Sequence, residues 1–227
     1  MGDNALPLRE RKHAQTRIAL LRAAMDALES RPLSQLTVRE LCDRALVSEA
    51  TFFNYFRSKS DLLVYYGQLW GVEAAWRDRR GGRSGLAAID ALFDFAARGM
   101  QERPGLWGEV IAHQAQARNK VEPPALSRAE RRAAFPDLDD IESVPEQGLQ
   151  AVLMPHLEVA VRRGELPPNT ILPAALALLV AIFFGVPLTL RAANLNGIGH
   201  LYRQALGTLW AGLRARAGHG RSAEPPA

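Results

Sequence analysis

The chain has 227 residues, enough for one large domain or two smaller ones, and its 48% hydrophobic content argues against a disordered chain. The net charge is +4, and ten basic against seven acidic side chains in residues 1–60 put most of this excess at the N-terminal end, which suits a polyanionic partner there. The single cysteine, Cys42, excludes an intramolecular disulfide and a cysteine-cluster metal site. The N-terminal residues lack the apolar segment of a secretory signal, so we expect a cytoplasmic protein.

The predicted elements are helical along the whole chain. Apolar residues recur at intervals of three and four, strand-like alternation is never sustained, and Gly or Pro falls between the periodic stretches. The clearest amphipathic stretches are Ile18–Leu28, Leu86–Met100, Leu149–Ala160 and Ile198–Leu213. The sequence therefore predicts an all-α fold.

Residues 36–63 hold three closely spaced helix starts. Thr37 with Glu40 forms a capping-box pattern, in which each side chain satisfies a free backbone N–H. Ser48 is expected to cap a second helix, and Ser58 a third, with Asp61 in the reciprocal position. Two short helices joined by a tight turn at residues 45–47 form a helix-turn-helix, whose second helix enters the major groove of DNA.

We expect the exposed side chains of this segment to contact DNA. The second helix would present base-reading groups, and Lys59 would meet a phosphate at the start of the third helix. Arg39 is either a base contact or part of a solvated face. The predicted DNA-binding residues are Thr37, Arg39, Ser48, Glu49, Ala50, Thr51, Phe53, Asn54, Tyr55 and Lys59.

The same segment resembles the DNA-binding region of the TetR/AcrR family of transcriptional regulators. The resemblance is specific over about residues 15–65. It rests on Thr37, Val38, Ala45, Val47, Ser48, Thr51, Phe52, Phe53, Tyr55, Phe56, Ser58, Lys59 and Leu62. Three positions depart from the family pattern. Leu46 replaces the usual turn glycine, so the turn either avoids positive φ or tolerates strain. Phe53 replaces the commoner Tyr, and Cys42 a small core residue, where a packed thiol is favoured over a redox sensor.

The resemblance implies two functional parts. Residues 1–66, ordered from about residue 12, would be the DNA-binding domain, 67–217 a helical ligand-binding and dimerisation domain, and 218–227 a disordered tail. The implied activity is that of a repressor released from a palindromic double-stranded operator by a small lipophilic effector. A DNA-binding regulator without small-molecule input, or an activator, remains an alternative.

The C-terminal part supplies many apolar and aromatic side chains for an elongated pocket. Its predicted lining is Phe93, Met100, Trp107, His113, His156 and Phe183, although each also suits an ordinary core. The last two helices, about 170–192 and 197–216, are predicted to form a homodimer interface through Leu201, Ala205, Leu209 and Leu213.

Two other classes of protein are weighed against the regulator. The uncharged stretch 166–190 is long enough to span a membrane, but its prolines and the lack of a second such stretch favour a buried helix, so no membrane partner is expected. Catalytic Ser-His-Asp, paired-carboxylate and metal-ligand patterns are missing from the sequence. Glu109 and His113 lie four apart without a further ligand placed nearby. We therefore expect no enzyme activity, metal or cofactor.

Overall fold

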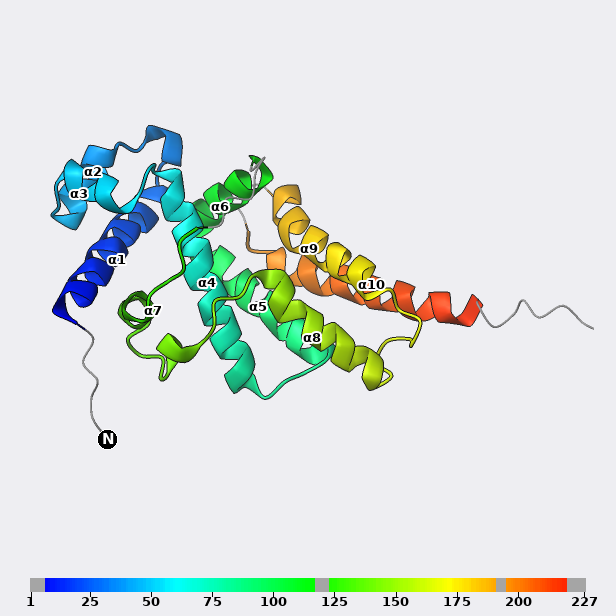
Figure 1. The fold of residues 1–227 in the computed structure, drawn as a ribbon. Coiled ribbons are helices and arrows are strands. Elements are labelled where there is room, and N and C mark those ends of the chain that lie inside the picture. Colours follow the sequence, from blue (N-terminus) through cyan, green and yellow to red (C-terminus); the bar gives the residue numbers. More distant parts are fainter. Residues whose placement is uncertain (1–6, 117–122, 191–194, 220–227) are drawn as a thin grey trace, which may run out of the picture. The chain divides into compact units, whose positions relative to one another are not determined.

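The computed structural model describes residues 7–116, 123–190 and 195–219, and Figure 1 shows their arrangement along the chain. Within these ranges every regular element is helical, which confirms the predicted all-α class. The α-helices are α1 (Leu8–Leu28), α2 (Val38–Ala45), α3 (Glu49–Tyr55), α4 (Ser60–Gly81), α5 (Leu86–Glu102), α6 (Pro104–Gln116), α7 (Arg128–Ala134), α8 (Leu149–Arg162), α9 (Leu172–Thr189) and α10 (Ile198–His219), with short 3-10 helices η1 (Leu33–Gln35) and η2 (Ile141–Ser143). The predicted disordered tail lies outside the described residues from residue 220 onward, while residues 218 and 219 belong to α10.

The chain forms two compact units. The first unit joins Met1–Trp76 with Arg103–Glu146, and the second joins Arg77–Glu102 with Gln147–Ala227. This division does not coincide with the expected boundary at residues 66 and 67, because α6 and α7 pack against α1. The first unit therefore holds the helix-turn-helix together with later helices.

Gly105 allows α6 to pack closely against α1. A Cβ at this position would lie 2.1 Å from the carbonyl oxygen of Leu28, so a larger residue would push the two helices apart. The Glu29 carboxylate accepts the N–H groups of Gly105 (3.2 Å) and Leu106 (3.3 Å) in the first turn of α6. A carboxylate from the end of α1 thus caps the start of α6.

In the second unit, α5 packs against α8 and α10, and α9 lies beside α8 and α10 (Figure 1). Three of the aromatic rings in its core pack together: Phe93 meets Phe183 and Tyr202 edge to face, with ring centroids 5.6 and 5.0 Å away. Pro187 lacks an N–H, so the carbonyl of Phe183 four residues earlier has no helical donor. The hydroxyl of Tyr202 donates to that carbonyl at 2.7 Å, and α10 thereby satisfies the open acceptor in α9.

Helix α9 is apolar on every side but is buried on one. Its buried residues, Ala175, Leu179, Phe183 and Pro187, follow each other at intervals of four and form a single strip. By length and composition the helix could cross a membrane, with a mean hydropathy of 2.2, and 22% of it is buried. Leu178 and Leu188 are 47% and 62% exposed, so an apolar surface remains beside the strip.

Candidate DNA-binding site

The first helix of the predicted motif begins with a complete capping box. The Thr37 hydroxyl accepts the N–H of Glu40 at 3.1 Å, and the Glu40 carboxylate accepts the N–H of Thr37 at 2.8 Å, as the sequence predicts. The hydrogen bonds from the Thr37 backbone and hydroxyl, and then from Arg31, lower the pKa of Glu40 from 4.5 to about 2. Glu40 therefore remains a carboxylate over the whole physiological range.

The turn after α2 tolerates a positive φ at Leu46, which is the strained one of the two conformations that the sequence left open. Leu46 has φ 56° and ψ 44°, the left-handed conformation that suits glycine, and its side chain is 91% exposed. The turn closes with a hydrogen bond from the N–H of Val47 to the carbonyl of Cys42 at 3.0 Å. Cys42 is buried, which raises the pKa of its thiol, as expected for a packed side chain.

Helix α3 begins as predicted at Ser48, whose hydroxyl accepts the N–H of Thr51 at 3.1 Å. Phe52 is fully buried and its ring lies 5.7 Å from that of Phe56, which fixes the inner face of the helix. The remaining side chains of α3 lie outside this inner face. Glu49, Ala50, Phe53 and Asn54 are exposed, and Thr51 and Tyr55 are half-buried.

Two predicted contacts come from the start of α2. Thr37 and Arg39 are both exposed there. The structure therefore leaves these two residues and the outer face of α3 open, as binding to DNA requires.

The expected cap of α4 is wrong in its detail. The helix begins at Ser60, and Ser58 donates its hydroxyl to the Asp61 carboxylate at 2.9 Å. Asp61 also accepts the N–H of Arg57 at 2.8 Å, so the acidic side chain closes the turn before α4. An aspartate is a strong acceptor for several donors at once, and the chain uses it here in place of a serine cap.

Lys59 has structural partners that the sequence did not indicate. Its ammonium donates to the carbonyl of Leu33 at 2.9 Å and to that of Leu36. An ammonium has three N–H groups, so one is left for another acceptor. Lys59 therefore holds the turn before α2, and a phosphate contact would have to use the remaining donor.

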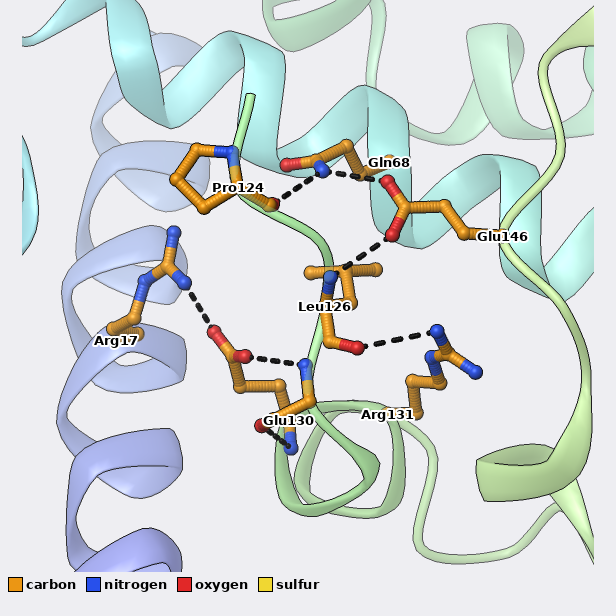
Figure 2. A network of polar contacts seen from close by, with 8 residues as sticks. Arg17, Gln68, Pro124, Leu126, Glu130, Arg131 and Glu146 are labelled. Carbon is orange, nitrogen blue, oxygen red and sulfur yellow. Dashed lines mark hydrogen bonds and ion pairs between the residues drawn. The ribbon is translucent and has the colours of Figure 1, made fainter. Parts of the chain in front are cut away.

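A buried polar network fixes α1 within the same unit. The guanidinium of Arg17 is bonded to the Glu130 carboxylate of α7 (Figure 2). The same guanidinium lies over the rings of Tyr65 (4.1 Å) and Phe56 (5.0 Å). Glu130 also forms a capping box with Ser127 at the start of α7. Sequence reasoning did not single out Arg17, although a charge on the buried face of α1 was the available signal.

The segment before α7 is bound to α4 in the same network. Gln68 donates to the carbonyl of Pro124 at 2.9 Å and to the carboxylate of Glu146 at 2.6 Å. Glu146 in turn accepts the N–H of Leu126 at 2.9 Å (Figure 2). Residues 124–146 are thus joined by side chains to both α1 and α4.

The six predicted pocket residues are divided between the two units. Phe93, Met100 and Phe183 are buried in the second unit around Tyr202, whose hydroxyl oxygen lies 3.6 Å from the Met100 sulfur. Trp107 and His113 lie on α6 in the first unit.

The surroundings of the other aromatic side chains were not predicted. The Trp107 ring meets those of Tyr66 (5.6 Å) and Trp70 (5.5 Å). His156, on α8, lies 2.9 Å from the Asp78 carboxylate. Sequence reasoning missed Tyr66 and Trp70 because a helical pattern places residues on a face without showing which faces meet.

The predicted dimer residues lie beside the buried face of α10. The buried strip consists of Ile198, Tyr202, Leu206 and Trp210, whereas the predicted residues are half-buried. These are Leu201, Ala205, Leu209 and Leu213. Glu109, which the sequence weighed as a metal ligand, instead accepts the N–H of Leu33 at 3.1 Å and has a structural role.

Among the described residues every regular element is helical, and α2 and α3 form a helix-turn-helix with an open outer face on its second helix, the arrangement that helix-turn-helix proteins place in the major groove of DNA. Residues 20–66 match the family model described as "Bacterial regulatory proteins, tetR family". This match shows that the N-terminal region is similar to TetR-family DNA-binding domains.

Several solved structures with the same fold are transcriptional regulators. FadR of Thermus thermophilus, a repressor in complex with lauroyl-CoA, is 24% identical with a TM-score of 0.62, over 93% of this chain and 100% of that one. A regulator from Rhodococcus sp. RHA1 is 22% identical with a TM-score of 0.53, covering 89% and 98%. The ketosteroid regulator KstR2 of Mycobacterium tuberculosis is 18% identical with a TM-score of 0.53, covering 87% and 94%. No curated protein sequence matches the chain.

Proposed function

We propose that the chain is a homodimeric repressor that leaves a palindromic operator when it binds a small lipophilic effector. The observation that carries the DNA-binding part is the outer face of α3, which Phe52 holds from behind and which displays Phe53 and Asn54 to solvent. Asparagine pairs with adenine through two hydrogen bonds, and an apolar ring contacts the thymine methyl group. Arg39, exposed at the start of α2, is the side chain that we expect to read guanine in the same groove.

The exposed apolar surface of α9 supports a dimer. A second copy would cover Leu178 and Leu188 of α9 together with the half-buried α10 stripe, which consists of Leu201, Ala205, Leu209 and Leu213. Two helices from each partner would then form a four-helix interface. Two recognition helices related by a two-fold axis would then read half-sites about 34–36 Å apart or further by whole turns. In such a dimer the apolar surface of α9 is covered by protein rather than by lipid.

The dimer is tested by Leu209→Arg, which introduces a charge into the stripe. Sedimentation should show a dimer for the wild type and for the control Gln150→Arg on the exposed face of α8, and a monomer for Leu209→Arg. A wild type that sediments as a monomer at micromolar concentration would contradict the proposal.

The aromatic cluster of Tyr66, Trp70 and Trp107 supports an effector site between α4 and α6 within the first unit. Flat and apolar side chains bind lipophilic groups. The bound lauroyl-CoA of the Thermus thermophilus structure carries such a group. An acyl chain or an aromatic compound is therefore the effector class that we propose.

The contacts of α6 give such an effector a route to the DNA-binding helices. Glu29 caps the first turn of α6, and Glu109 of α6 binds the backbone of Leu33 just before α2. Lys59 binds the carbonyl of the same Leu33. A shift of α6 would therefore act on η1 and α2, and a tenfold loss of operator affinity requires about 1.4 kcal/mol of coupling.

One observation favours a regulator without a small-molecule input. Phe93, Met100 and Phe183 are at most 2% exposed and pack on one another and on Tyr202, as core residues do. A thermal-shift screen of fatty acids, acyl-CoA thioesters and aromatic compounds separates the two hypotheses. Hits should raise the melting temperature of the wild type, less so that of Trp107→Leu, and should lower operator affinity. A complete lack of hits would favour the regulator without an effector, and hits confined to hydrophilic compounds would contradict a lipophilic one.

The DNA proposal is tested by selecting bound fragments from the genome and titrating the wild type and α3 variants. Thr51→Ala and Asn54→Ala should change sequence preference, while Gln150→Ala on α8 should bind like the wild type. If the wild type bound every genomic fragment no better than random DNA, the regulator would not be sequence-specific and the proposal would fail.

A further inference from the structure

Residues 124–146, which we call the strap, are held together by one side chain. Arg131 of α7 donates to the carbonyl of Leu126 near the start of the strap at 3.1 Å (Figure 2). It also donates to the carbonyls of Glu142 (3.4 Å) and Val144 near the end. A guanidinium can serve several acceptors at once because it carries five N–H groups in a fixed plane. The two ends of the strap are therefore fixed relative to each other.

Two side chains of α4 fasten the strap to that helix. Gln68 binds both ends, because its amide donates to the Pro124 carbonyl (2.9 Å) and to the Glu146 carboxylate (2.6 Å) (Figure 2). In the middle of the strap, the carbonyl of Asp139 accepts the indole N–H of Trp76 at 2.7 Å. The strap is thus bound to α4 at three points along its length.

The strap and the proposed effector site use different faces of α4. At about 100° per residue, Gln68 and Trp76 lie about 80° apart around the helix. Tyr66 and Trp70, which meet the ring of Trp107, each lie at least about 80° from both. A change at Gln68 or Trp76 can therefore loosen the strap without removing a ring of the aromatic cluster.

A row of buried contacts leads from the strap to the recognition helix. Glu130 of the strap is bonded to Arg17, whose guanidinium lies 5.0 Å from the centre of the Phe56 ring. Phe56 is the residue that ends α3, and its ring lies 5.7 Å from that of Phe52 on the inner face of the helix. All four side chains are buried, and densely packed groups cannot shift independently of one another. A displacement of α7 would therefore be passed on to α3.

We propose that the strap is a positioning element for the recognition helix: through Glu130, Arg17 and Phe56 it fixes α3 and thereby raises the preference for the operator. This inference rests on the DNA-binding function proposed above and adds residues that act on α3 from a distance. Side chains that read bases have to be held within about 0.5 Å of their working positions. Non-specific binding depends on attraction to the phosphates and tolerates looser placement. A loosened strap should therefore weaken binding to the operator more than binding to random DNA.

The test compares Gln68→Ala/Trp76→Phe, which removes both α4 fasteners, with Gln101→Ala by fluorescence anisotropy. Each protein is titrated on the genomic fragment that the wild type selects and on a random-sequence duplex. Gln101 donates to the carbonyl of Asn196 at 2.9 Å in the second unit, so it is a matched control for the loss of a side-chain hydrogen bond. The ratio of the two affinities should fall by about 2- to 30-fold in the double variant, the range for residues that act through intervening contacts. A purely structural loss would lower both affinities by the same factor and leave the ratio unchanged, as we expect for Gln101→Ala.

Hydrogen exchange on the same proteins follows the two ends of the row of contacts. The amides of α7 should exchange faster in the double variant than in the wild type, and so should those of α3. Arg17→Lys keeps a cation for Glu130 but lacks the planar group that lies over Phe56. It should therefore lower the affinity ratio while the amides of α7 remain protected.

Unchanged exchange in α7 would show that Gln68 and Trp76 do not hold the strap. Faster exchange in α7 with an unchanged affinity ratio would show that the strap does not position α3. Either result, or a wild-type ratio in Arg17→Lys, would overturn this inference while leaving sequence-specific binding intact. A wild type without preference for any genomic fragment would instead overturn the proposed function, and the inference with it.

Discussion

The guanidinium of Arg17 in α1 is bonded to the carboxylate of Glu130 in α7, with both side chains almost completely withdrawn from water. The two residues are 113 positions apart in the sequence, so the pair joins the first helix to the middle of the chain. A buried ion pair is weak evidence for stability, because desolvation of the two charges offsets their attraction. Removal of either residue nevertheless leaves the other without its buried partner.

We predict that Arg17→Met and Glu130→Gln each lower the free energy of unfolding of the first unit by about 3–5 kcal/mol, because each leaves an uncompensated buried group. The double variant Arg17→Met/Glu130→Gln should be closer to the wild type than the sum of the singles. Urea titrations of the wild type, the two single variants and the double variant measure this double-mutant cycle. Strictly additive effects on the free energy of unfolding would show that the two residues act independently.

The hydrogen bond from Tyr202 to the Phe183 carbonyl can be tested by a second double-mutant cycle. Tyr202→Phe should lower the free energy of unfolding by about 1–3 kcal/mol, because a buried carbonyl without a helical donor loses its partner. In a Pro187→Ala background the new N–H can reach the same carbonyl, so the effect of Tyr202→Phe should shrink. An unchanged effect in that background would mean that Pro187 is not the reason for the hydrogen bond.

The left-handed Leu46 predicts a stabilising substitution. Leu46→Gly should raise the free energy of unfolding by about 1 kcal/mol, because glycine adopts this conformation without strain and the Leu46 side chain is exposed. Ala45→Gly, one residue earlier in α2, is the matched control and should destabilise by about 1 kcal/mol. Thermal melts of both variants test this, and a lower melting temperature for Leu46→Gly would contradict the explanation.

The capping box predicts a pH dependence with a definite sign. The pKa of Glu40 is lower in the folded protein, at about 2, than its ordinary value of 4.5, so its contribution to stability is complete above about pH 5. The contribution diminishes as the pH falls from 4.5 through 2. Urea titrations of wild type and Glu40→Gln at about pH 7, 4 and 3 should therefore converge toward the lowest pH. A gap that stays constant would show that the carboxylate charge is not involved.

The sequence predicted the helix-turn-helix in detail because its signals are local. Capping by Thr37 and Ser48 acts within three residues, and the all-α class follows from spacing along each helix. The contacts of Lys59, Arg17 and Tyr202 join segments that are far apart in the chain, and helical periodicity gives no information on which faces meet. The reciprocal cap at Ser58 was wrong because the Asp61 carboxylate accepts the donors of that turn in its place.

The close packing of α6 against α1 limits how readily the N-terminal segment can be exchanged between proteins of this fold. A fragment cut at residue 66 would keep the reading helices but lack Glu130, and it would expose the Leu28 carbonyl against which Gly105 rests. A chimera that exchanges only the first 66 residues would place residues of two different proteins at the Arg17–Glu130 contact and at the Leu28–Gly105 contact. A portable module for this chain includes residues 103–146, so the proposed DNA contacts are more simply changed as single side chains on α3 than by exchanging whole domains.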